Sequence, residues 1–172
     1  MATAVREALA AARRSAVHLE MRDSYMRDDP AFIAWQEGHR PDPDNRDSWW
    51  RPWLDIVTET TCRGVAMRRA RIVSEPISDY IRYEYDGTFT NIAAGEQVRW
   101  LPRRKTRDLA LPGVDFWVFD DATVIYNHFT GDGQWSEPGM ELTADPALVR
   151  LCSSAFDAVW ERAIPHTEYH PV

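Results

Sequence analysis

The chain has 172 residues and a mass of 19.9 kDa, and its 44% hydrophobic and 27% charged residues are typical of one soluble globular domain, with little room for a second. Its 20 basic and 27 acidic residues give a net charge of -7, which disfavours direct binding to nucleic acid. The N-terminal segment carries charges where a signal peptide needs an apolar run, and no run of about 18 apolar residues occurs. We therefore expect a cytoplasmic domain over residues 1–172 that does not associate with a membrane.

Helices and strands alternate in the first part of the chain. The Ala-rich residues 1–14, with Val5 and Leu9 at helical spacing, predict an N-terminal helix that we interpret as a candidate interaction arm. Asp29 directly before Pro30 is a helix-start signal, and it predicts a short helix that ends at Gly38. Further helices are expected over residues 47–63 and 76–94, and strands over residues 15–22, 65–74 and 97–101.

The second part of the chain predicts a hairpin and a long helix. Strands over residues 114–119 and 123–129 are joined by an acidic turn, and a short strand over 140–143 precedes a helix that starts at Asp145 and ends before Pro165. Taken together, the elements predict an α/β (or α+β) fold with one mixed sheet flanked by helices. The loop over residues 102–112 carries the only dense basic cluster, which is either a solvated loop or an interface made by Arg103, Arg104, Lys105 and Arg107.

Charged and polar side chains recur inside the predicted strands, where they are costly unless they are paired or hydrated. His18, Glu20, Arg69, Arg71 and Asp115 are the main examples. One interpretation is a structural ion-pair network between neighbouring strands. The other is a ligand cleft at the strand ends, where an arginine would bind an anion and carboxylates would orient donors. The ligand-binding candidates on this second interpretation are Glu20, Arg22, Arg71, Glu75, Tyr83 and Asp115.

Motifs of familiar catalytic and cofactor sites are missing from the sequence. Neither Cys62 nor Cys152 belongs to a metal or redox motif, and no glycine-rich phosphate loop or hydrolase elbow occurs. His166 and His170 share the spacing of one helix face, but two imidazoles are fewer ligands than a zinc site uses. We therefore predict no cofactor, no metal and no assigned catalytic residue.

Several segments resemble known families. The order of AGEQVRWLPR, VDFWVFDDATVIYNHF and FDAVWERAIPH resembles the C-terminal half of phospholipase D-like domains, particularly degenerate versions attached to bacterial helix-turn-helix regulators. With HLEMRDSY, FIAWQEG, RRARIVSEPISDYIRYEY and LPGVDFWVFDD, the whole chain is similar to an actinobacterial family of unknown function, often encoded beside such regulators. The resemblance implies a phospholipase D-like fold, a helix-turn-helix regulator as partner and, by analogy, a homodimer.

The chain departs from the phospholipase D-like pattern at the residues that perform the chemistry. Active members use a His nucleophile and a Lys two residues later, followed by an Asp. Counting back from Asp120 places Gly113 and Asp115 at those positions, and counting from Asp121 places Val114 and Phe116 there. Neither register supplies a nucleophile or a phosphate clamp, so the resemblance implies a non-catalytic member.

We therefore expect a regulatory domain that binds a partner protein or a small ligand, with a link to transcriptional control. The alternative is an enzyme of unfamiliar type acting on an anionic substrate. In that case Glu20 or Asp115 would be the general base and Arg71 would stabilise the anion.

Overall fold

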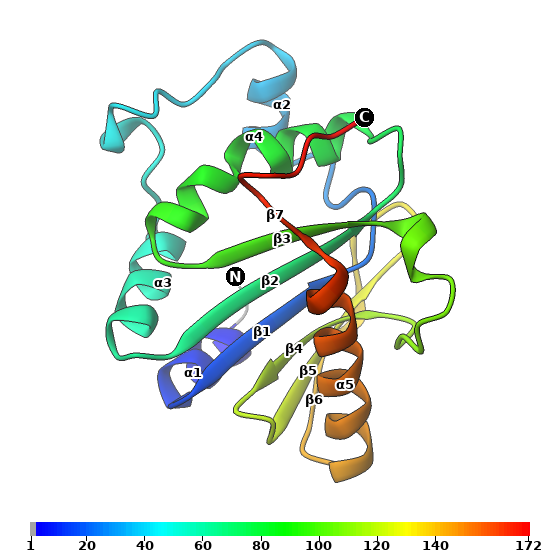
Figure 1. Cartoon of the computed structure of the whole chain (residues 1–172). Helices are drawn as coiled ribbons and strands as arrows, with labels where there is room; N and C mark the ends of the chain where they lie inside the picture. The colour runs from blue at the N-terminus through cyan, green and yellow to red at the C-terminus, as the bar shows by residue number, and fades with distance from the viewer. Residues whose placement is uncertain (1–2) are drawn as a thin grey trace.

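A seven-stranded mixed sheet forms the centre of the molecule in the computed structural model, which describes residues 3–172 (Figure 1). Residue 2, where the predicted N-terminal helix begins, lies outside the described residues. The strands are β1 (Ser15–Glu20), β2 (Ala66–Val73), β3 (Gln97–Pro102), β4 (Asp115–Phe119), β5 (Thr123–Phe129), β6 (Trp135–Thr143) and β7 (Ile164–Pro165). The α-helices are α1 (Thr3–Ala11), α2 (Pro30–Gln36), α3 (Pro52–Cys62), α4 (Asp79–Ala93) and α5 (Pro146–Arg162), with short 3-10 turns at Arg46–Ser48 and Arg103–Thr106.

The strand order is β6-β5-β4-β1-β2-β3-β7. Strands β1, β2 and β3 are parallel and are connected through helices, whereas β4 pairs antiparallel with the other side of β1. The predicted hairpin is confirmed as β4 and β5, and Asp120 and Asp121 form its turn with positive φ angles of 54° and 53°. The register places Glu20 beside Arg71, and His18 between Arg69 and Trp117. These polar residues therefore share one face of the sheet.

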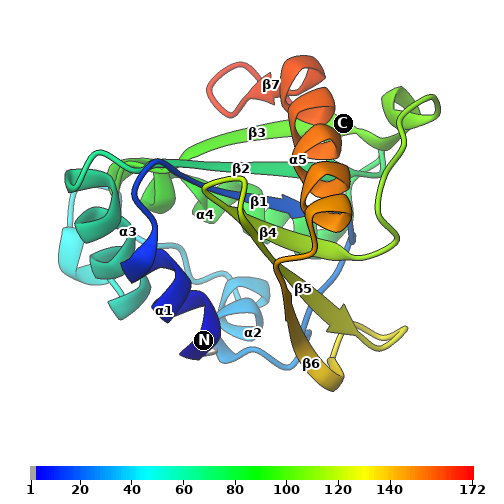
Figure 2. The same cartoon turned by 90° about the horizontal axis from the view of Figure 1, so that it is seen from below.

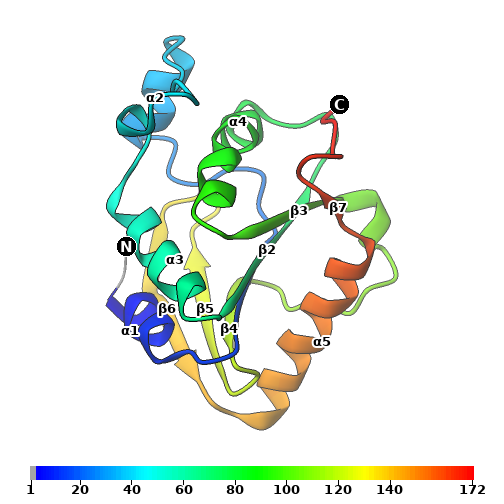
Figure 3. The same cartoon turned by 60° about the vertical axis from the view of Figure 1, so that its left-hand side comes forward.

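Helices cover both faces of the sheet (Figures 2 and 3). On one face α5 packs Val149, Cys152, Phe156 and Val159 against the strands. Asp145 caps this helix by accepting hydrogen bonds from two backbone N–H groups, and Pro146 occupies its first turn. Each such fully buried apolar side chain stabilises the fold by about 1.5–3 kcal/mol, so α5 is a principal source of stability.

On the opposite face α1, α3 and α4 cover the sheet, with α2 packed outside α4 (Figure 3). Val5 and Leu9 of α1 are buried in the same core as Leu54 and Val57 of α3. Because its apolar side is used in this way, α1 is part of the domain core, and its role as an interaction arm stays a prediction. None of the helices within residues 3–172 is long and apolar enough to cross a bilayer.

Several boundaries differ from those expected. The predicted helix over residues 47–63 is broken, because Pro52 starts α3 only after a 3-10 turn. Helix α4 begins at Asp79, where Ser78 accepts a hydrogen bond from Ile81 N–H as the N-cap. Strand β6 begins at Trp135, earlier than the predicted residue 140, and β7 was not expected.

Candidate functional site

The carboxyl ends of β1, β2 and β3 meet the start of β4 at one end of the sheet. Strands β2 and β4 lie on opposite sides of β1, so the connections that leave this end of the sheet run in opposite directions. Open α/β sheets commonly bind ligands at such a point. The segment after β1 crosses this end and meets the loop after β5, since Met26 N–H donates to Gly133 O at 3.0 Å. We call this region the strand-end cleft.

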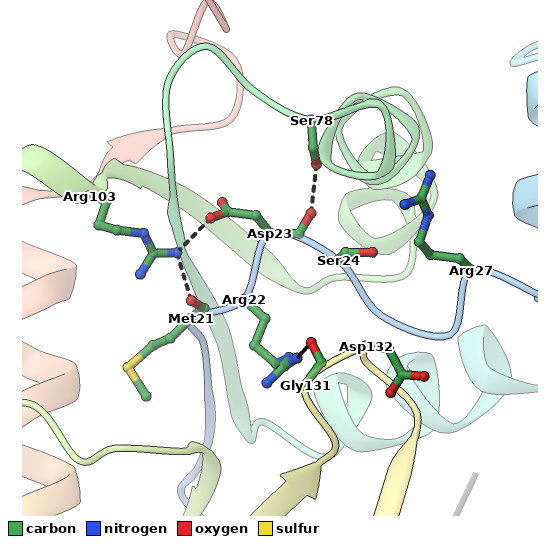
Figure 4. A pocket seen from close by; sticks show the side chains of 9 residues that line it. All are labelled: Met21, Arg22, Asp23, Ser24, Arg27, Ser78, Arg103, Gly131 and Asp132. Atoms are coloured by element: carbon green, nitrogen blue, oxygen red, sulfur yellow. Dashed lines mark hydrogen bonds and ion pairs between the residues drawn. The ribbon is translucent and has the colours of Figure 1, made fainter.

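Two adjoining cavities, of about 690 and 430 Å³, open in the strand-end cleft. Met21, Arg22 and Arg103 line both of them. The first cavity is further lined by Asp23, Ser24, Arg27, Ser78, Gly131 and Asp132 (Figure 4), and the second by Leu111, Pro112, Gly113, Val114, Asp115, Asn127 and Phe129. These sizes suit a small molecule.

Arg22 connects the two sides of the first cavity. Its guanidinium donates hydrogen bonds to the carbonyl oxygens of Thr130 (2.8 Å) and Gly131 (3.2 Å), as Figure 4 shows for Gly131. Its Nε is buried without a hydrogen-bond partner in residues 3–172, as are Ser24 Oγ and Asn127 Oδ1. Unpartnered buried polar atoms are destabilising, so their presence around the cleft indicates hydrogen-bonding capacity that a polar ligand would use.

Arg103 holds the cleft together from the end of β3. Its Nε donates to Ser74 Oγ at 2.9 Å, and one of its terminal nitrogens donates to Met21 O at 2.7 Å and to Asp23 Oδ2 at 3.1 Å. Figure 4 shows the side chain pointing toward Met21 and Asp23. The predicted basic loop over residues 102–112 was expected to be exposed. Its first arginine, Arg103, differs from this expectation because its guanidinium is engaged in the cleft.

Asp115 lies at the floor of the second cavity with a relative exposure of 2%. Its Oδ1 accepts a hydrogen bond from Met21 N–H at 2.8 Å, and its Oδ2 accepts one from the Tyr25 hydroxyl at 2.5 Å. Burial raises the pKa of Asp115 to about 6, against the opposing effect of the Tyr25 hydrogen bond, and the negative charge of Glu20 adds to the increase. Asp115 therefore exchanges a proton near neutral pH.

Deeper under the helices lies a buried ion-pair network made by Glu20, Arg69, Arg71, Glu84 and Glu96. Arg71 donates to Glu20 and to Glu84, each at 2.5 Å. Arg69 donates to Glu20 and, at 2.9 Å, to Glu96. Two arginines of β2 thereby share the carboxylate of Glu20 on the adjacent parallel strand β1, and the charges compensate one another away from water.

The protonation states in the buried ion-pair network follow from this pairing. Burial alone would raise the pKa of Glu20, but the charges of Arg69 and Arg71 outweigh it and hold that pKa far below its usual value. Burial would lower the pKa of Arg71, but Glu20 and Glu84 raise it instead. Glu20, Arg69 and Arg71 are therefore charged across the physiological range.

The six ligand-binding candidates fall in four places. Arg22 and Asp115 line the strand-end cleft, whereas Glu20 and Arg71 belong to the buried ion-pair network. Glu75 lies elsewhere, paired with Arg104 and accepting a hydrogen bond from the Tyr169 hydroxyl at 3.0 Å. Tyr83 packs against Phe32 and Trp35 beneath α2. The structure thus does not bring all six together in one cleft. The ion-pair interpretation holds for Glu20 and Arg71, whereas ligand binding by Arg22 and Asp115 stays a prediction.

Several cleft residues were not among the candidates: Ser24, Tyr25, Arg27, Asn127 and Asp132. Most of them come from irregular segments, where no periodicity marks the direction of a side chain. Asn127 is the exception, because it stands opposite Asp115 across the hairpin. The predicted pairing of the two strands could have identified it.

The remaining polar candidates have structural surroundings. His166 Nδ1 accepts a hydrogen bond from Trp100 Nε1 at 3.1 Å, and no group of His, Cys, Asp and Glu within residues 3–172 has an arrangement that could hold a metal ion. In the basic loop, Arg104 pairs with Glu75, and the carbonyl oxygen of Lys105 accepts a hydrogen bond from Arg162.

Residues 3–171 match the family described as "Domain of unknown function (DUF6879)". The chain belongs to this family. No curated protein matches the chain.

Solved structures that resemble the chain include two proteins of similar size. NucT from Helicobacter pylori has a TM-score of 0.54 at 12% identity, and Nuc from Salmonella typhimurium, a phospholipase D family member, has a TM-score of 0.50 at 13% identity. Each match covers 94% of this chain and 88% of the other. The DUF6879 chain therefore has a phospholipase D-like fold, and the likeness extends over nearly the whole chain rather than its C-terminal half.

A further similar structure is TrmBL2, an archaeal chromatin protein described as showing a novel mode of DNA binding. It has a TM-score of 0.50 at 15% identity, and the match covers 93% of this chain. The match covers 48% of TrmBL2, so this chain spans about half the length of that protein.

The positions that the resemblance assigned to the phospholipase D-like His and Lys can now be located. Gly113 and Asp115, from one register, both line the second cavity of the strand-end cleft. In the other register Val114 also lines that cavity, but Phe116 is buried on the opposite face with the residues of α5. In the first register both positions therefore lie in the cleft, whereas in the second only one does, and none of the four positions carries a His or a Lys.

Proposed function

We propose that this DUF6879 domain is a non-catalytic member of the phospholipase D-like fold that binds a small anionic ligand in the strand-end cleft. The observation that carries the proposal is the place of Gly113 and Asp115 inside a cleft that also contains Arg22 and Arg103. A glycine has no nucleophile, and a carboxylate cannot clamp a phosphate, yet the arginines and the cavity remain.

The other residues of the required chemical types do not replace the missing ones. The chain has five histidines, and none of them lines either cavity of the strand-end cleft. His18 is stacked on Trp117 at 4.1 Å between ring centroids, and burial lowers its pKa well below the usual value. Lys105 also lies outside both cavities. This supports binding without turnover.

The charges in the cleft favour an anion. Arg22, Arg27 and Arg103 all line the first cavity. Of the two acids there, Asp23 accepts hydrogen bonds from Arg103 and Ser74. Asp132 accepts one from the nearby Thr130 hydroxyl. Arg27 is exposed and Arg22 donates only to carbonyl oxygens, so both guanidiniums retain their positive charge for a ligand.

The same proposal includes a regulatory role in the cytoplasm. A ligand in the cleft would contact the segment after β1, the basic loop and the loop after β5 together, so that their shared surface would depend on the ligand. The partner we propose is a helix-turn-helix regulator, and the domain would act as a homodimer. The likeness to about half of TrmBL2, a DNA-binding chromatin protein, supports a link to DNA-associated proteins without requiring this acidic chain to bind DNA itself.

Two measurements test the proposal. Pure protein should not hydrolyse bis(p-nitrophenyl) phosphate, and turnover that disappears in Asp115→Asn would overturn the non-catalytic assignment. Titration of labelled protein with inorganic phosphate should shift the amide resonances of Arg22, Ser24 and Gly131. Arg22→Gln should weaken this binding at least tenfold, whereas Arg107→Gln in the basic loop should leave it unchanged. Equal binding by both variants would remove the cleft as the site.

A second candidate is an enzyme that uses Asp115 as a general acid or base. The pKa of about 6 in a cavity beside the Tyr25 hydroxyl favours it. Glu20 and Arg71 do not take part in this version, because the buried ion-pair network engages both of them. A panel of phosphate and carboxylate esters would reveal it as an activity with an inflection near pH 6 that Asp115→Asn abolishes.

A further inference from the structure

A second groove lies between α2, α4 and the segment before α3, and it shares no lining residue with the strand-end cleft. Its volume is about 660 Å³. Figure 1 shows α2 beside α4, with the connecting segment running down to α3. The lining residues that matter here are Trp35, Trp49, Arg51, Tyr83, Glu84 and Gly87.

Arg51 is the one lining cation whose charge lacks an acidic partner. Its guanidinium donates to Thr90 Oγ1 at 3.0 Å and to Asn91 Oδ1 at 3.3 Å, which are both neutral acceptors. No carboxylate in residues 3–172 lies within 4.0 Å of it. The surrounding walls partly desolvate Arg51 and lower its pKa. A guanidinium in these surroundings favours an anionic ligand.

Two of the three carboxylates that line the groove are paired with cations other than Arg51. Glu84 reaches inward and pairs with Arg71 at 2.5 Å. Asp86 accepts a hydrogen bond from Trp35 Nε1 at 2.9 Å and lies 3.6 Å from Arg40 Nε. The third lining acid, Asp29, accepts the N-cap hydrogen bond of α2 from Ala31 N–H at 2.8 Å and forms no ion pair in residues 3–172. None of the three acids pairs with Arg51, so its positive charge is left for an incoming anion.

Gly87 stands in the middle of α4, where glycine weakens a helix. Its φ is not in the left-handed region, and a Cβ atom built there would meet nothing within 4 Å. Neither backbone conformation nor internal packing therefore requires glycine at this position. Since Gly87 lines the groove, its missing side chain lets a ligand approach the helix backbone closely.

Aromatic side chains form the apolar walls of the groove. Trp49 is half-buried against Trp50 and Phe89, and Tyr83 is half-buried against Phe32 and Trp35. The Tyr83 hydroxyl makes no hydrogen bond within the described chain, so it remains a donor for a ligand. An apolar ring is the group that such walls accommodate best.

We propose that this groove binds a small aromatic anion, with the anionic group on Arg51 and the ring over Gly87 between the walls that carry Trp49 and Tyr83. A phosphate monoester and a carboxylate share the chemistry that Arg51 recognises, and both are included in the test.

The probes are phenyl phosphate and benzoate, compared with inorganic phosphate, which lacks the ring, and benzyl alcohol, which lacks the charge. Titrations of labelled protein should show the two aromatic anions shifting the amides of Gly87, Thr90 and Asn91. At these amides the two comparison compounds should bind at least tenfold more weakly. Equal affinity of inorganic phosphate and phenyl phosphate at these amides would overturn the proposal, and so would shifts confined to other parts of the molecule.

Gly87 offers a matched pair of variants. Gly87→Ala should fold and retain most binding, whereas Gly87→Leu should fill the groove and reduce affinity at least tenfold while its melting temperature stays at or above the wild-type value. Arg51→Gln should reduce affinity by a similar factor, and it decides the matter independently if Gly87→Leu does not fold. Undiminished binding by Arg51→Gln would refute the site. Arg22→Gln should leave it unchanged, which separates this groove from the strand-end cleft.

Discussion

Two polar regions lie on the same sheet and use the same residue types in different ways. In the buried ion-pair network every carboxylate of Glu20, Glu84 and Glu96 meets an arginine. In the strand-end cleft, two residues after the end of β1, Arg22 donates only to carbonyl oxygens and its Nε has no partner in the described chain. The network is therefore complete without a ligand, whereas the cleft has unused hydrogen-bonding and charge capacity.

The difference shows that position relative to the strand end separates paired charges from unpaired polar groups. Within β1 and β2 the neighbouring strands fix both partners, so a charge there must be paired during folding. Beyond the last residue of β1 the chain leaves the sheet, and its side chains face open cavities. The alternation of polar residues along residues 15–22 thus begins in the buried ion-pair network and continues into the strand-end cleft.

The largest expected loss of stability comes from a substitution in the buried ion-pair network. Arg71→Met leaves Glu84 without its cation and leaves Glu20 with Arg69 alone, and should lower the free energy of unfolding by about 3–5 kcal/mol in urea denaturation. The matched control is Arg99→Met on the next strand, which loses a hydrogen bond to Trp160 O and should cost about 1 kcal/mol. Adding Glu20→Gln to Arg71→Met should recover part of the loss. Similar costs for the two single variants would show that the network does not stabilise the fold.

The second effect is the dependence of stability on pH. Asp115 in the cleft and Glu20 in the network change the free energy of unfolding in opposite directions as the pH rises. The pKa of Asp115 in the folded state is about 6, above its ordinary value of 3.8. The contribution of Asp115 to the free energy of unfolding is therefore fully present below pH 3.8 and is lost as the pH rises through 6. The loss amounts to about 3 kcal/mol. Glu20 acts in the opposite direction, because its pKa is depressed, and its contribution disappears as the pH falls below 4.5.

Asp115→Asn should therefore flatten the stability profile between about pH 4 and pH 7, while the acid loss due to Glu20 persists. Urea unfolding at a series of pH values measures both changes in stability, the one due to Asp115 and the one due to Glu20. The slope of the wild type alone does not decide, because the lowered pKa of His18 makes stability rise with pH up to about 6.5. A variant with the same slope as the wild type would contradict the raised pKa of Asp115. Tyr25→Phe provides a control that keeps the carboxylate and removes only its hydroxyl partner.

Much of the fold followed from sequence patterns, because the helix caps and the alternating strands are local signals. Asp29 and Asp145 each precede a proline and start their helices as expected. Strand β7 escaped prediction because it comprises only Ile164 and Pro165, and its pairing with β3 depends on where α5 ends. The early start of β6 was missed because Pro138 and Gly139 interrupt its pattern.

The site was predictable only in part. The polar residues of the strands marked the correct sheet face, but one-dimensional alternation does not say how far a side chain lies from the strand end or which helix covers it. Arg71 was therefore predicted to line a cleft, although α4 covers it and supplies Glu84 as its partner. Glu75 and Tyr83 follow β2 in sequence, yet the chain carries them to other surfaces.

A smaller effect tests the boundary between the two regions with neighbouring arginines. Arg103→Gln should cost about 1–2 kcal/mol, because its guanidinium ties Met21, Asp23 and Ser74 together. Arg104→Gln removes one pair with Glu75 at an exposed position and should cost less than about 1 kcal/mol. Thermal denaturation of the two variants side by side is sufficient. A larger cost at Arg104 would mean that the basic loop, and not the cleft wall, contributes the stability.

The smallest expected effect on stability is the most informative about the cleft. Arg22→Gln gives up hydrogen bonds to two carbonyl oxygens that remain near solvent, but it also removes a buried Nε without a partner, so its net cost should stay within about 0.5 kcal/mol. The same substitution should weaken phosphate binding at least tenfold. A variant that is strongly destabilised would place Arg22 with the structural arginines of the network. A variant that is stable and binds poorly would show that selection retains this arginine for a ligand rather than for the fold.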